Sequence, residues 1–264
     1  MTTGATSLAY DDLGPGEPAL LLLTGWCSSR RRWSDAAARL ARGRRVVSFD
    51  WRSHGDSPPV RGDFGLAELV DDALAVIQAT RLGTLIPCAA SHAGWVAIEL
   101  RRRLGPRIPA IVHLDWMLTE PPPAYRRLLS ELQSPERWPA ARESLLKSWR
   151  AGDSTPEIAE AIETMRRHEG DMWMRSGREI EAAYRRAGSP LRALSALRPP
   201  PRVLHLYGQP AEPEYLQAQQ RFAHAHDWFS VRRLATRTHF SMIEAPAEVA
   251  AEIEALARPV TPVT

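Results

Sequence analysis

Residues 85–95 carry the strongest chemical signal in the chain. An apolar run leads into the small-x-Ser-x-small sequence of residues 89–93 and then into a helical pattern. A turn from strand to helix this tight needs small residues on both sides of the serine, and it raises the Ser91 hydroxyl into a cleft. Ser91 would then sit at a helix N-terminus, where free backbone N–H groups can hold an oxyanion. The pattern indicates a functional serine, with an ordinary joint between a strand and a helix as its alternative.

A histidine must reach Ser91 before its hydroxyl can act as a nucleophile. Residues 238–246 read Thr-His-Phe-Ser-Met-Ile-Glu-Ala-Pro and follow the last apolar run, where such architectures carry this histidine. The segment resembles the H-x-x-x-x-E-x-P pattern of hydrolases, so we predict His239 as the base of the site. The other histidines lie in less suitable places, in a polar connection (His224, His226), within strands (His113, His205) or in a helical insertion (His168).

The histidine needs a carboxylate that orients its ring, and two places in the chain offer one. Asp115 directly follows the apolar run 110–114, whereas Glu212 and Glu214 follow the run that ends at Tyr207. Most α/β-hydrolases take this acid from the later position. Asp115, however, lies directly at the end of a strand, and its short side chain suits contact with an imidazole. We predict Asp115 as the acid, with a helix N-cap or a turn residue as its alternative role.

Residues 22–27, Leu-Leu-Thr-Gly-Trp-Cys, close the first clear strand with a glycine turn. In an architecture with a nucleophile elbow, this turn supplies a second backbone N–H to the oxyanion site. We assign that donor to Trp26 and its companion to His92.

The segment 50–57 follows the next strand and reads Asp-Trp-Arg-Ser-His-Gly-Asp-Ser. It resembles the D-x-R-G-x-G-x-S loop of α/β-hydrolases. We expect its role to be structural, with Asp50 and Arg52 fixing the loop beneath the site.

Short apolar runs alternate with helical patterns along most of the chain. The runs that predict strands are residues 19–23, 45–49, 84–89, 110–114, 202–207 and 228–234. Such alternation predicts a mostly parallel central sheet flanked by helices on both faces. Together with the motifs above, it predicts an α/β-hydrolase fold.

The alternation stops between about residue 120 and residue 197, where amphipathic helical segments replace it. We predict a helical cap at 120–197, inserted into a core made of 1–119 and 198–264, rather than additional surface helices. A cap that closes over an apolar or aromatic ligand needs large side chains on its underside. The segment has three candidates for such substrate contacts, Trp138, Trp149 and Trp173.

Composition excludes several classes of function. With 264 residues and 44% hydrophobic content, the chain can bury one substantial core. The net charge of +3 comes from arginines scattered among acidic residues, so we expect no nucleic-acid partner. Cys27 and Cys88 are the only cysteines, which predicts neither a disulfide framework nor a metal site and favours the cytoplasm. The longest apolar run is too short to cross a bilayer and no secretory signal opens the chain, so we expect a soluble protein without a membrane partner.

Six short segments resemble one group of proteins with this fold. They are residues 114–116 (Leu-Asp-Trp), 134–138 (Ser-Pro-Glu-Arg-Trp), 175–178 (Arg-Ser-Gly-Arg), 187–190 (Ala-Gly-Ser-Pro), 209–215 (Gln-Pro-Ala-Glu-Pro-Glu-Tyr) and 238–240 (Thr-His-Phe). Together they resemble the cofactor-independent 3-hydroxy-4-oxoquinoline and 3-hydroxy-4-oxoquinaldine 2,4-dioxygenases. The resemblance spans nearly the whole chain, cap included.

The resemblance implies that a hydrolase triad is reused for oxygenation. His239 would abstract the proton of the ring hydroxyl, and Asp115 would orient and polarise the imidazole. Ser91 would hydrogen-bond the substrate instead of forming an acyl intermediate, and the Trp26 N–H would lie in the oxyanion pocket.

This chain departs from the family beside the pocket. Ser28 and Ala90 stand where the resemblance implies histidines. Their small side chains would enlarge the pocket and remove hydrogen-bond donors near the bound anion. Both positions therefore bear on which substrate the pocket accepts.

We expect a dioxygenase that needs no metal, flavin or other cofactor. Its substrates would be O2 and a 3-hydroxy-4(1H)-quinolone or a related N-heteroaromatic enol, whose ring it would cleave with release of carbon monoxide. A serine ester or amide hydrolase that uses Ser91, His239 and Asp115 is the main alternative, because the same three residues permit acyl transfer. The third hypothesis is a protein that binds a small molecule in the same pocket but no longer catalyses a reaction.

Overall fold

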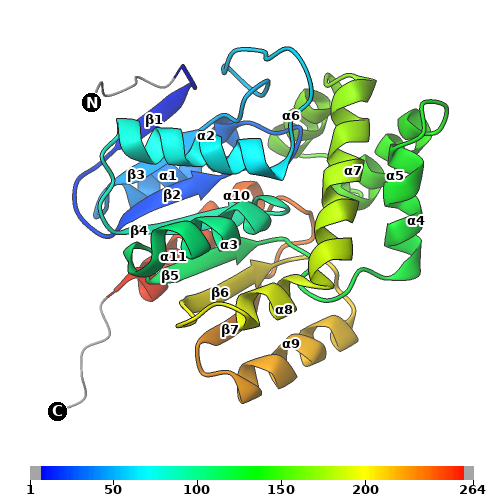
Figure 1. Cartoon of the computed structure of the whole chain (residues 1–264). Helices are drawn as coiled ribbons and strands as arrows, with labels where there is room; N and C mark the ends of the chain where they lie inside the picture. The colour runs from blue at the N-terminus through cyan, green and yellow to red at the C-terminus, as the bar shows by residue number, and fades with distance from the viewer. Residues whose placement is uncertain (1–6, 259–264) are drawn as a thin grey trace.

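The structure is a computed structural model that describes residues 7–258 (Figure 1). Within these residues, a seven-stranded sheet has the order β1-β3-β2-β4-β5-β6-β7. The strands are β1 (Tyr10–Leu13), β2 (Ala19–Leu23), β3 (Val46–Phe49), β4 (Leu85–Ala90), β5 (Ala110–Leu114), β6 (Arg202–Tyr207) and β7 (Phe229–Arg233). Only the β1–β3 pair of this sheet is antiparallel, so the prediction of a mostly parallel central sheet is confirmed.

Continuous apolar runs form the strands in the middle of the sheet. The leucines at 20–23 in β2 have no exposed surface, as expected for a parallel strand that is covered on both faces. Each strand predicted from the sequence is present, with ends within one residue of those expected. β1 was not predicted, because its Tyr-Asp-Asp-Leu sequence is exposed at the edge of the sheet and has no apolar run.

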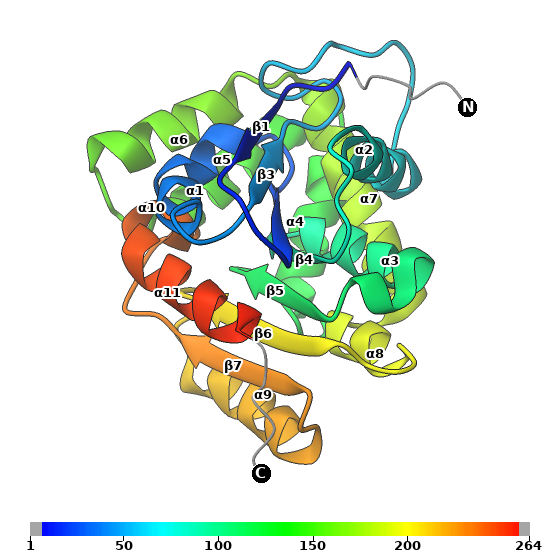
Figure 2. The same cartoon turned by 90° about the vertical axis from the view of Figure 1, so that its left-hand side faces the viewer.

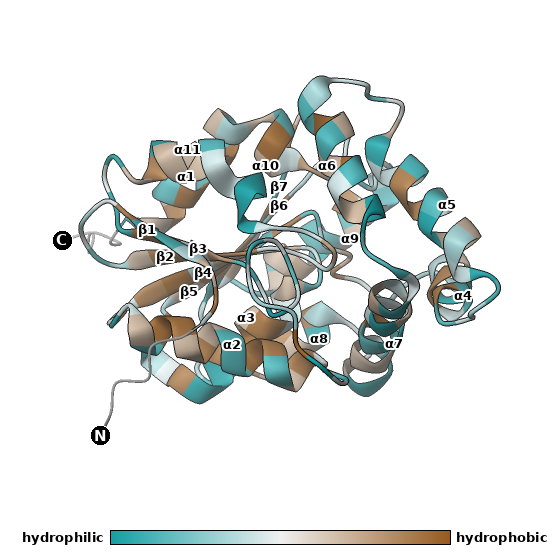
Figure 3. Cartoon of the chain, turned by 90° about the horizontal axis from the view of Figure 1, so that it is seen from above, coloured by the Kyte–Doolittle hydropathy of each residue, from teal (hydrophilic) through white to brown (hydrophobic). Residues whose placement is uncertain are grey.

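Helices cover both faces of the sheet (Figure 2 and Figure 3). One face carries α1 (Ser34–Leu40), α10 (Ser241–Glu244) and α11 (Pro246–Ala257), and the other carries α2 (Leu66–Ala79), α3 (Ala93–Leu104) and α8 (Pro190–Ser195). Helix α9 (Pro213–Ala225) packs against β7, and η1 (Arg30–Trp33) and η2 (Gly105–Arg107) are short 3-10 helices. None of the helices described here is both long enough and apolar enough to cross a membrane.

Four further helices follow β5 and lie beyond the carboxyl ends of the strands (Figure 1). They are α4 (Pro123–Leu132), α5 (Trp138–Arg150), α6 (Pro156–Arg166) and α7 (Gly170–Ala187). Helix α4 packs against α5 and α7, and α5 packs against α6, whereas α8 packs against α3 in the core as well as against α7. We call α4–α7 the cap helices. The domain limits 1–119, 120–197 and 198–264 stay a prediction.

The strand register brings the candidate residues to one edge of the sheet. The ladder continues one residue past β4 and β5, because the Ser91 N–H donates to the Leu114 carbonyl (2.8 Å) and the Asp115 N–H donates to the Leu206 carbonyl (2.9 Å). Ser91 and Asp115 therefore start their loops at the same level. In parallel sheets this carboxyl edge is where ligands bind.

Candidate active site

Ser91 occupies the sharp turn between β4 and α3. Its φ of +53° lies in the left-handed region, which costs a non-glycine residue about 1–2 kcal/mol and is kept only where the surroundings enforce it. Gly25, in the loop after β2, approaches so closely that a Cβ on it would lie 3.2 Å from the Ser91 Cβ. The predicted nucleophile elbow has its geometric counterpart here.

Two backbone donors flank Ser91. Within residues 7–258, neither the Trp26 N–H nor the His92 N–H has a hydrogen-bond acceptor in the protein. Both residues line the same cavity as Ser91. The pair can therefore receive a negatively charged oxygen, as an oxyanion pocket does.

His239 lies in the loop after β7 and is held by the cap. Its backbone N–H donates to the Trp149 carbonyl (2.8 Å), and its ring stacks on the Trp149 indole with centroids 4.9 Å apart. Burial lowers the pKa of His239 to about 4, so the imidazole is neutral at neutral pH and ready to accept a proton.

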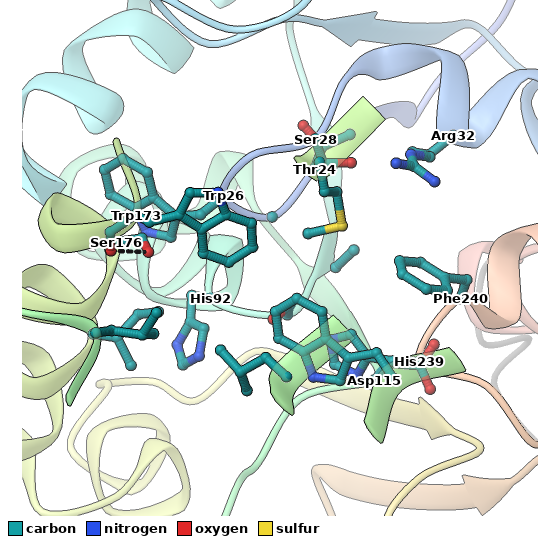
Figure 4. A pocket seen from close by; sticks show the side chains of 18 of the residues that line it. Thr24, Trp26, Ser28, Arg32, His92, Asp115, Trp173, Ser176, His239 and Phe240 are labelled. Carbon is teal, nitrogen blue, oxygen red and sulfur yellow. Dashed lines mark hydrogen bonds between the residues drawn. The ribbon is translucent and has the colours of Figure 1, made fainter. Parts of the chain in front are cut away.

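The His239 ring makes no hydrogen bond to protein groups in the part of the chain that the structure describes. It is bonded neither to Ser91 nor to Asp115, although all three line one cavity. Figure 4 shows His239 and Asp115 in that cavity. Their lack of a direct hydrogen bond differs from the expectation that Asp115 orients the imidazole directly. Trp149 holds the His239 ring by stacking on it, and the Asp115 carboxylate already accepts hydrogen bonds from Gly208 and Ser241.

Asp115 is buried, with 1% of its surface exposed, and its φ is +45°. Its carboxylate accepts three hydrogen bonds of 2.9 Å, from the Gly208 N–H, the Ser241 N–H and the Ser241 hydroxyl. Thr236 extends this network through a 2.9 Å bond between its hydroxyl and that of Ser241. Burial raises the pKa of Asp115 to about 6, against the opposing effect of these hydrogen bonds.

The two competing glutamates lie elsewhere. Glu212 is the N-cap of α9 and Glu214 is in its first turn, so Glu214 belongs to a helix and not to the loop that the sequence suggested. Neither glutamate lines the cavity that contains Arg32, Trp173 and His239. Glu212 lines an adjoining hollow together with His239, and Asp115 lines both. The arrangement favours the aspartate as the acid.

The cap helices supply a large part of the apolar wall of the cavity. Trp149 and Ala90 line it, and so do Trp173 and Ser28, which are labelled in Figure 4. The other apolar and aromatic residues that the cap contributes are Tyr125, Leu129, Leu132, Leu145, Met165 and Ile180. A planar aromatic ligand fits such a lining.

Trp138 does not line this cavity, so the predicted substrate contact does not hold for it. Its indole packs where a Cβ on Gly170 would come within 2.7 Å of the ring, and the Arg142 guanidinium lies 5.1 Å from the ring centroid. Trp138 therefore joins the start of α5 to the start of α7. Its role is to pack the cap helices against each other.

The His92 side chain connects the elbow to the cap. Its Nε2 lies 3.0 Å from the Tyr125 hydroxyl in α4. Burial lowers the pKa of His92 to about 3, so this ring is neutral as well. The sequence identified the His92 backbone but not this side-chain contact, which only the docking of α4 creates.

The loop at 50–57 has the structural role expected of it. The Asp50 carboxylate accepts hydrogen bonds from the Arg30 N–H (2.6 Å), the Arg30 guanidinium and the Asp56 N–H (2.9 Å). Arg52 forms a salt bridge of 2.6 Å with Asp72 in α2. Gly55 has a φ of +51°, and a Cβ there would overlap the Asp50 carboxylate.

Sequence reasoning missed several polar residues of the site. Thr24, Arg32, Tyr125 and Ser176 line the cavity, and Ser241 bonds the Asp115 carboxylate. The only signal for Ser241 was its place two residues after the base. Of the histidines set aside, His113 and His205 lie in β5 and β6 as predicted. His224 lies in α9 rather than in a polar connection, and His226 follows the end of that helix.

Comparisons with known proteins agree with this geometry. A family model described as alpha/beta hydrolase family matches residues 20–252. The chain is 38% identical to a 2-heptyl-3-hydroxy-4(1H)-quinolone dioxygenase of Mycobacteroides abscessus, over 95% of this chain and 94% of that one. It is 36% identical to a 1H-3-hydroxy-4-oxoquinoline 2,4-dioxygenase of Pseudomonas putida, over 96% and 97%. A solved structure of 1H-3-hydroxy-4-oxoquinoline 2,4-dioxygenase superposes with a TM-score of 0.91 at 36% identity, covering 95% of this chain and 96% of that one.

The fold and the elbow define a member of the alpha/beta hydrolase family, which confirms the predicted fold. Within that family the chain belongs to the 3-hydroxy-4-quinolone 2,4-dioxygenases, enzymes of the oxidoreductase type. The resemblance found in the sequence is confirmed.

Proposed function

We propose that this chain is a cofactor-independent, ring-cleaving 2,4-dioxygenase of 3-hydroxy-4(1H)-quinolones or closely related N-heteroaromatic enols. The observation that carries the proposal is the neutral His239 imidazole, which faces an aromatic-lined cavity and has no hydrogen bond to Ser91 within residues 7–258. An imidazole bonded to the serine would activate it for acyl transfer. A free imidazole is available to a proton on the substrate.

The names of the relatives support the substrate class. They are dioxygenases of 2-heptyl-3-hydroxy-4(1H)-quinolone and of 1H-3-hydroxy-4-oxoquinoline. In this chain, the Trp149 and Trp173 indoles offer flat apolar surfaces to such a ring. Ser91 and the two oxyanion donors, Trp26 and His92, are placed to bind its oxygen atoms.

The reaction would begin with a proton transfer. His239 takes the proton of the 3-hydroxyl group, and the resulting anion is stabilised by the Trp26 and His92 N–H groups. The anion passes one electron to O2, and the two radicals combine to form a C2–O bond. The distal oxygen then attacks C4.

The endoperoxide formed in this way breaks so that C3 leaves as carbon monoxide. C4 becomes the carboxylate of an N-acylanthranilate, and both atoms of O2 remain in that product. The proton held by His239 returns to the product or to water. Asp115, linked to the same loop through Ser241, supplies negative charge that favours the transient imidazolium.

The cap helices would shield the reaction from solvent. Their apolar side chains exclude water from the anion and keep the oxygenation intermediates from side reactions. The free, buried cysteines Cys27 and Cys88 are compatible with a reaction in the cytoplasm.

One experiment separates the candidate functions. Purified enzyme that has been stripped of metals is incubated with 3-hydroxy-4-quinolones and, separately, with p-nitrophenyl acetate. Oxygen consumption and carbon monoxide release are followed in the first case, and nitrophenolate release in the second. Oxygen consumption that depends on the quinolone supports the dioxygenase.

The other outcomes contradict the proposal. Nitrophenolate release without oxygen consumption would favour the serine hydrolase. Binding of quinolones without either product would favour a binding protein.

A further inference from the structure

The helix η1 carries three consecutive arginines with different surroundings. Arg30 contacts the carboxylates of Asp11, Asp50 and Asp56, and Arg31 contacts Asp56. A 3-10 helix has about three residues per turn, so adjacent side chains point in directions about 120° apart. Arg32 therefore points away from these acidic residues.

Arg32 points into the catalytic cavity, which it lines together with Ser28 (Figure 4). Only 8% of its surface is exposed. One terminal nitrogen, Nη2, donates to the Ala161 carbonyl in α6. The guanidinium carbon lies 5.4 Å from the centroid of the Phe240 ring.

The charge of Arg32 lacks a bonded counter-charge among the described residues. It forms no salt bridge there, and its buried Nη1 has no hydrogen-bond partner. Burial lowers the pKa of Arg32 to about 10, and the charge of the exposed Glu160 opposes this only in part. Burying an unpaired cation is costly, and because Arg32 also lines a cavity, an anionic group of a ligand bound there can complement its charge.

Arg32 is separated from the reacting end of the cavity. The Phe240 ring lies beside both Arg32 and the His239 ring, whose centroid is 6.0 Å from that of Phe240 (Figure 4). The oxyanion donors Trp26 and His92 flank Ser91, in the loop after β2 and at the elbow respectively. A group bound to Arg32 is therefore a substituent of the ligand, not the oxygen that His239 deprotonates.

We propose that Arg32 is a specificity residue that binds a carboxylate substituent of the quinolone substrate. The inference rests on the proposed function, since it assumes a quinolone whose hydroxyl faces His239. The carboxylate would pair with the guanidinium charge in an otherwise apolar surrounding.

The test compares matched ligands under anaerobic conditions, so that binding is measured without turnover. One pair is 2-heptyl-3-hydroxy-4-quinolone and the same molecule with a carboxylate at the end of the chain. The other is the 2-unsubstituted ring with and without a carboxylate on its benzene ring. Dissociation constants are obtained from quenching of tryptophan fluorescence.

The variants separate charge from packing. In wild type, we expect the carboxylate member of at least one pair to bind about tenfold tighter than its neutral partner. Arg32→Met should abolish or reverse this preference, and Arg32→Lys should keep part of it. Arg101→Met is the matched control, because Arg101 is also buried, donates through Nη2 to a backbone carbonyl and has an unpartnered Nη1, but lies outside the cavity.

Several outcomes would overturn the inference. In one, both neutral quinolones bind and neither carboxylate is preferred; in another, Arg32→Met leaves the preference intact. If no quinolone binds at all, the proposed function fails and the inference falls with it.

Discussion

Ser241 holds both oxygens of the Asp115 carboxylate, with its N–H donating to Oδ2 and its hydroxyl to Oδ1, each at 2.9 Å. Ser241 is two residues after His239. The acid is thus connected to the loop that carries the base through a serine, and not through the imidazole. The two hydrogen bonds between Ser241 and Asp115 hold the His239 loop against the end of β5 and keep the Asp115 carboxylate next to that loop.

Ser241→Ala should shift the pH dependence of turnover. The lost hydroxyl bond stabilises the ionised carboxylate, so the pKa of Asp115 should rise from about 6. Since turnover needs the ionised acid, the acidic limb of kcat/KM should move upward by about one pH unit, the equivalent of one charged hydrogen bond of about 1.5 kcal/mol. Ser230→Ala is the control, because that hydroxyl bonds to Val203 in the sheet. An unchanged limb in Ser241→Ala would contradict the positioning role.

The fold could be predicted from the sequence because its signals are local. Each central strand is an uninterrupted apolar run, and the elbow is set by small residues around Ser91. β1 could not be found in this way, because its own residues have no apolar run. It forms a strand only through its pairing with β3.

The site was only partly predictable, because helix packing decides which side chains enter it. Trp138 and Trp149 are both in α5, yet only Trp149 faces the cavity. The arginines at 30–32 look like a solvated charge run in the sequence, and only the turn of η1 directs Arg32 inward. His239, which lines the cavity, was easier to find, because its loop has a sequence pattern of its own.

His239→Ala should lose most activity at neutral pH and regain part of it in alkali. In the proposed mechanism, the neutral imidazole, whose pKa is lowered to about 4, removes the hydroxyl proton. Without it, turnover must wait until the substrate ionises by itself. Oxygen consumption measured from neutral to strongly alkaline pH checks this. A variant that stays inactive throughout, with its fold intact by circular dichroism, argues for a covalent mechanism instead.

Ser91→Ala should reduce kcat by about 10- to 100-fold. The loss corresponds to one hydrogen bond to a charged group, about 1.5–3 kcal/mol. Steady-state oxygen consumption measures the effect. A complete loss, accompanied by a covalent adduct on Ser91 after treatment of wild type with a phosphonofluoridate, would favour the hydrolase.

Trp149→Ala should raise the pKa of His239, because the stacked indole shields the imidazole from water. More of the base would then be protonated at mildly acidic pH, and activity there should fall further than at neutral pH. Trp138→Ala is the matched control in the same helix, since Trp138 lies outside the cavity. NMR titration of the His239 ring, together with the pH profile, tests the prediction, and equal effects of both variants would refute it.

Asp115→Asn should retain the fold and slow proton abstraction by orders of magnitude. The variant has no carboxylate to favour the protonated imidazole, so the His239 base becomes weaker. The acidic limb of activity that reflects the Asp115 pKa of about 6 should disappear from the residual rate.

Glu212→Gln and Glu214→Gln are the comparison variants for this prediction, because both glutamates lie at the start of α9 and were the competing candidates for the acid. Of the two, Glu212 lines a hollow that Asp115 and His239 also line, so it is the more stringent comparison. We expect them to change stability or substrate affinity modestly and to keep the wild-type pH profile. Loss of activity in either glutamine variant, with a mild effect of Asp115→Asn, would transfer the acid role to α9. In that case the three hydrogen bonds on Asp115 would serve only to join β5, β6 and the loop that carries His239.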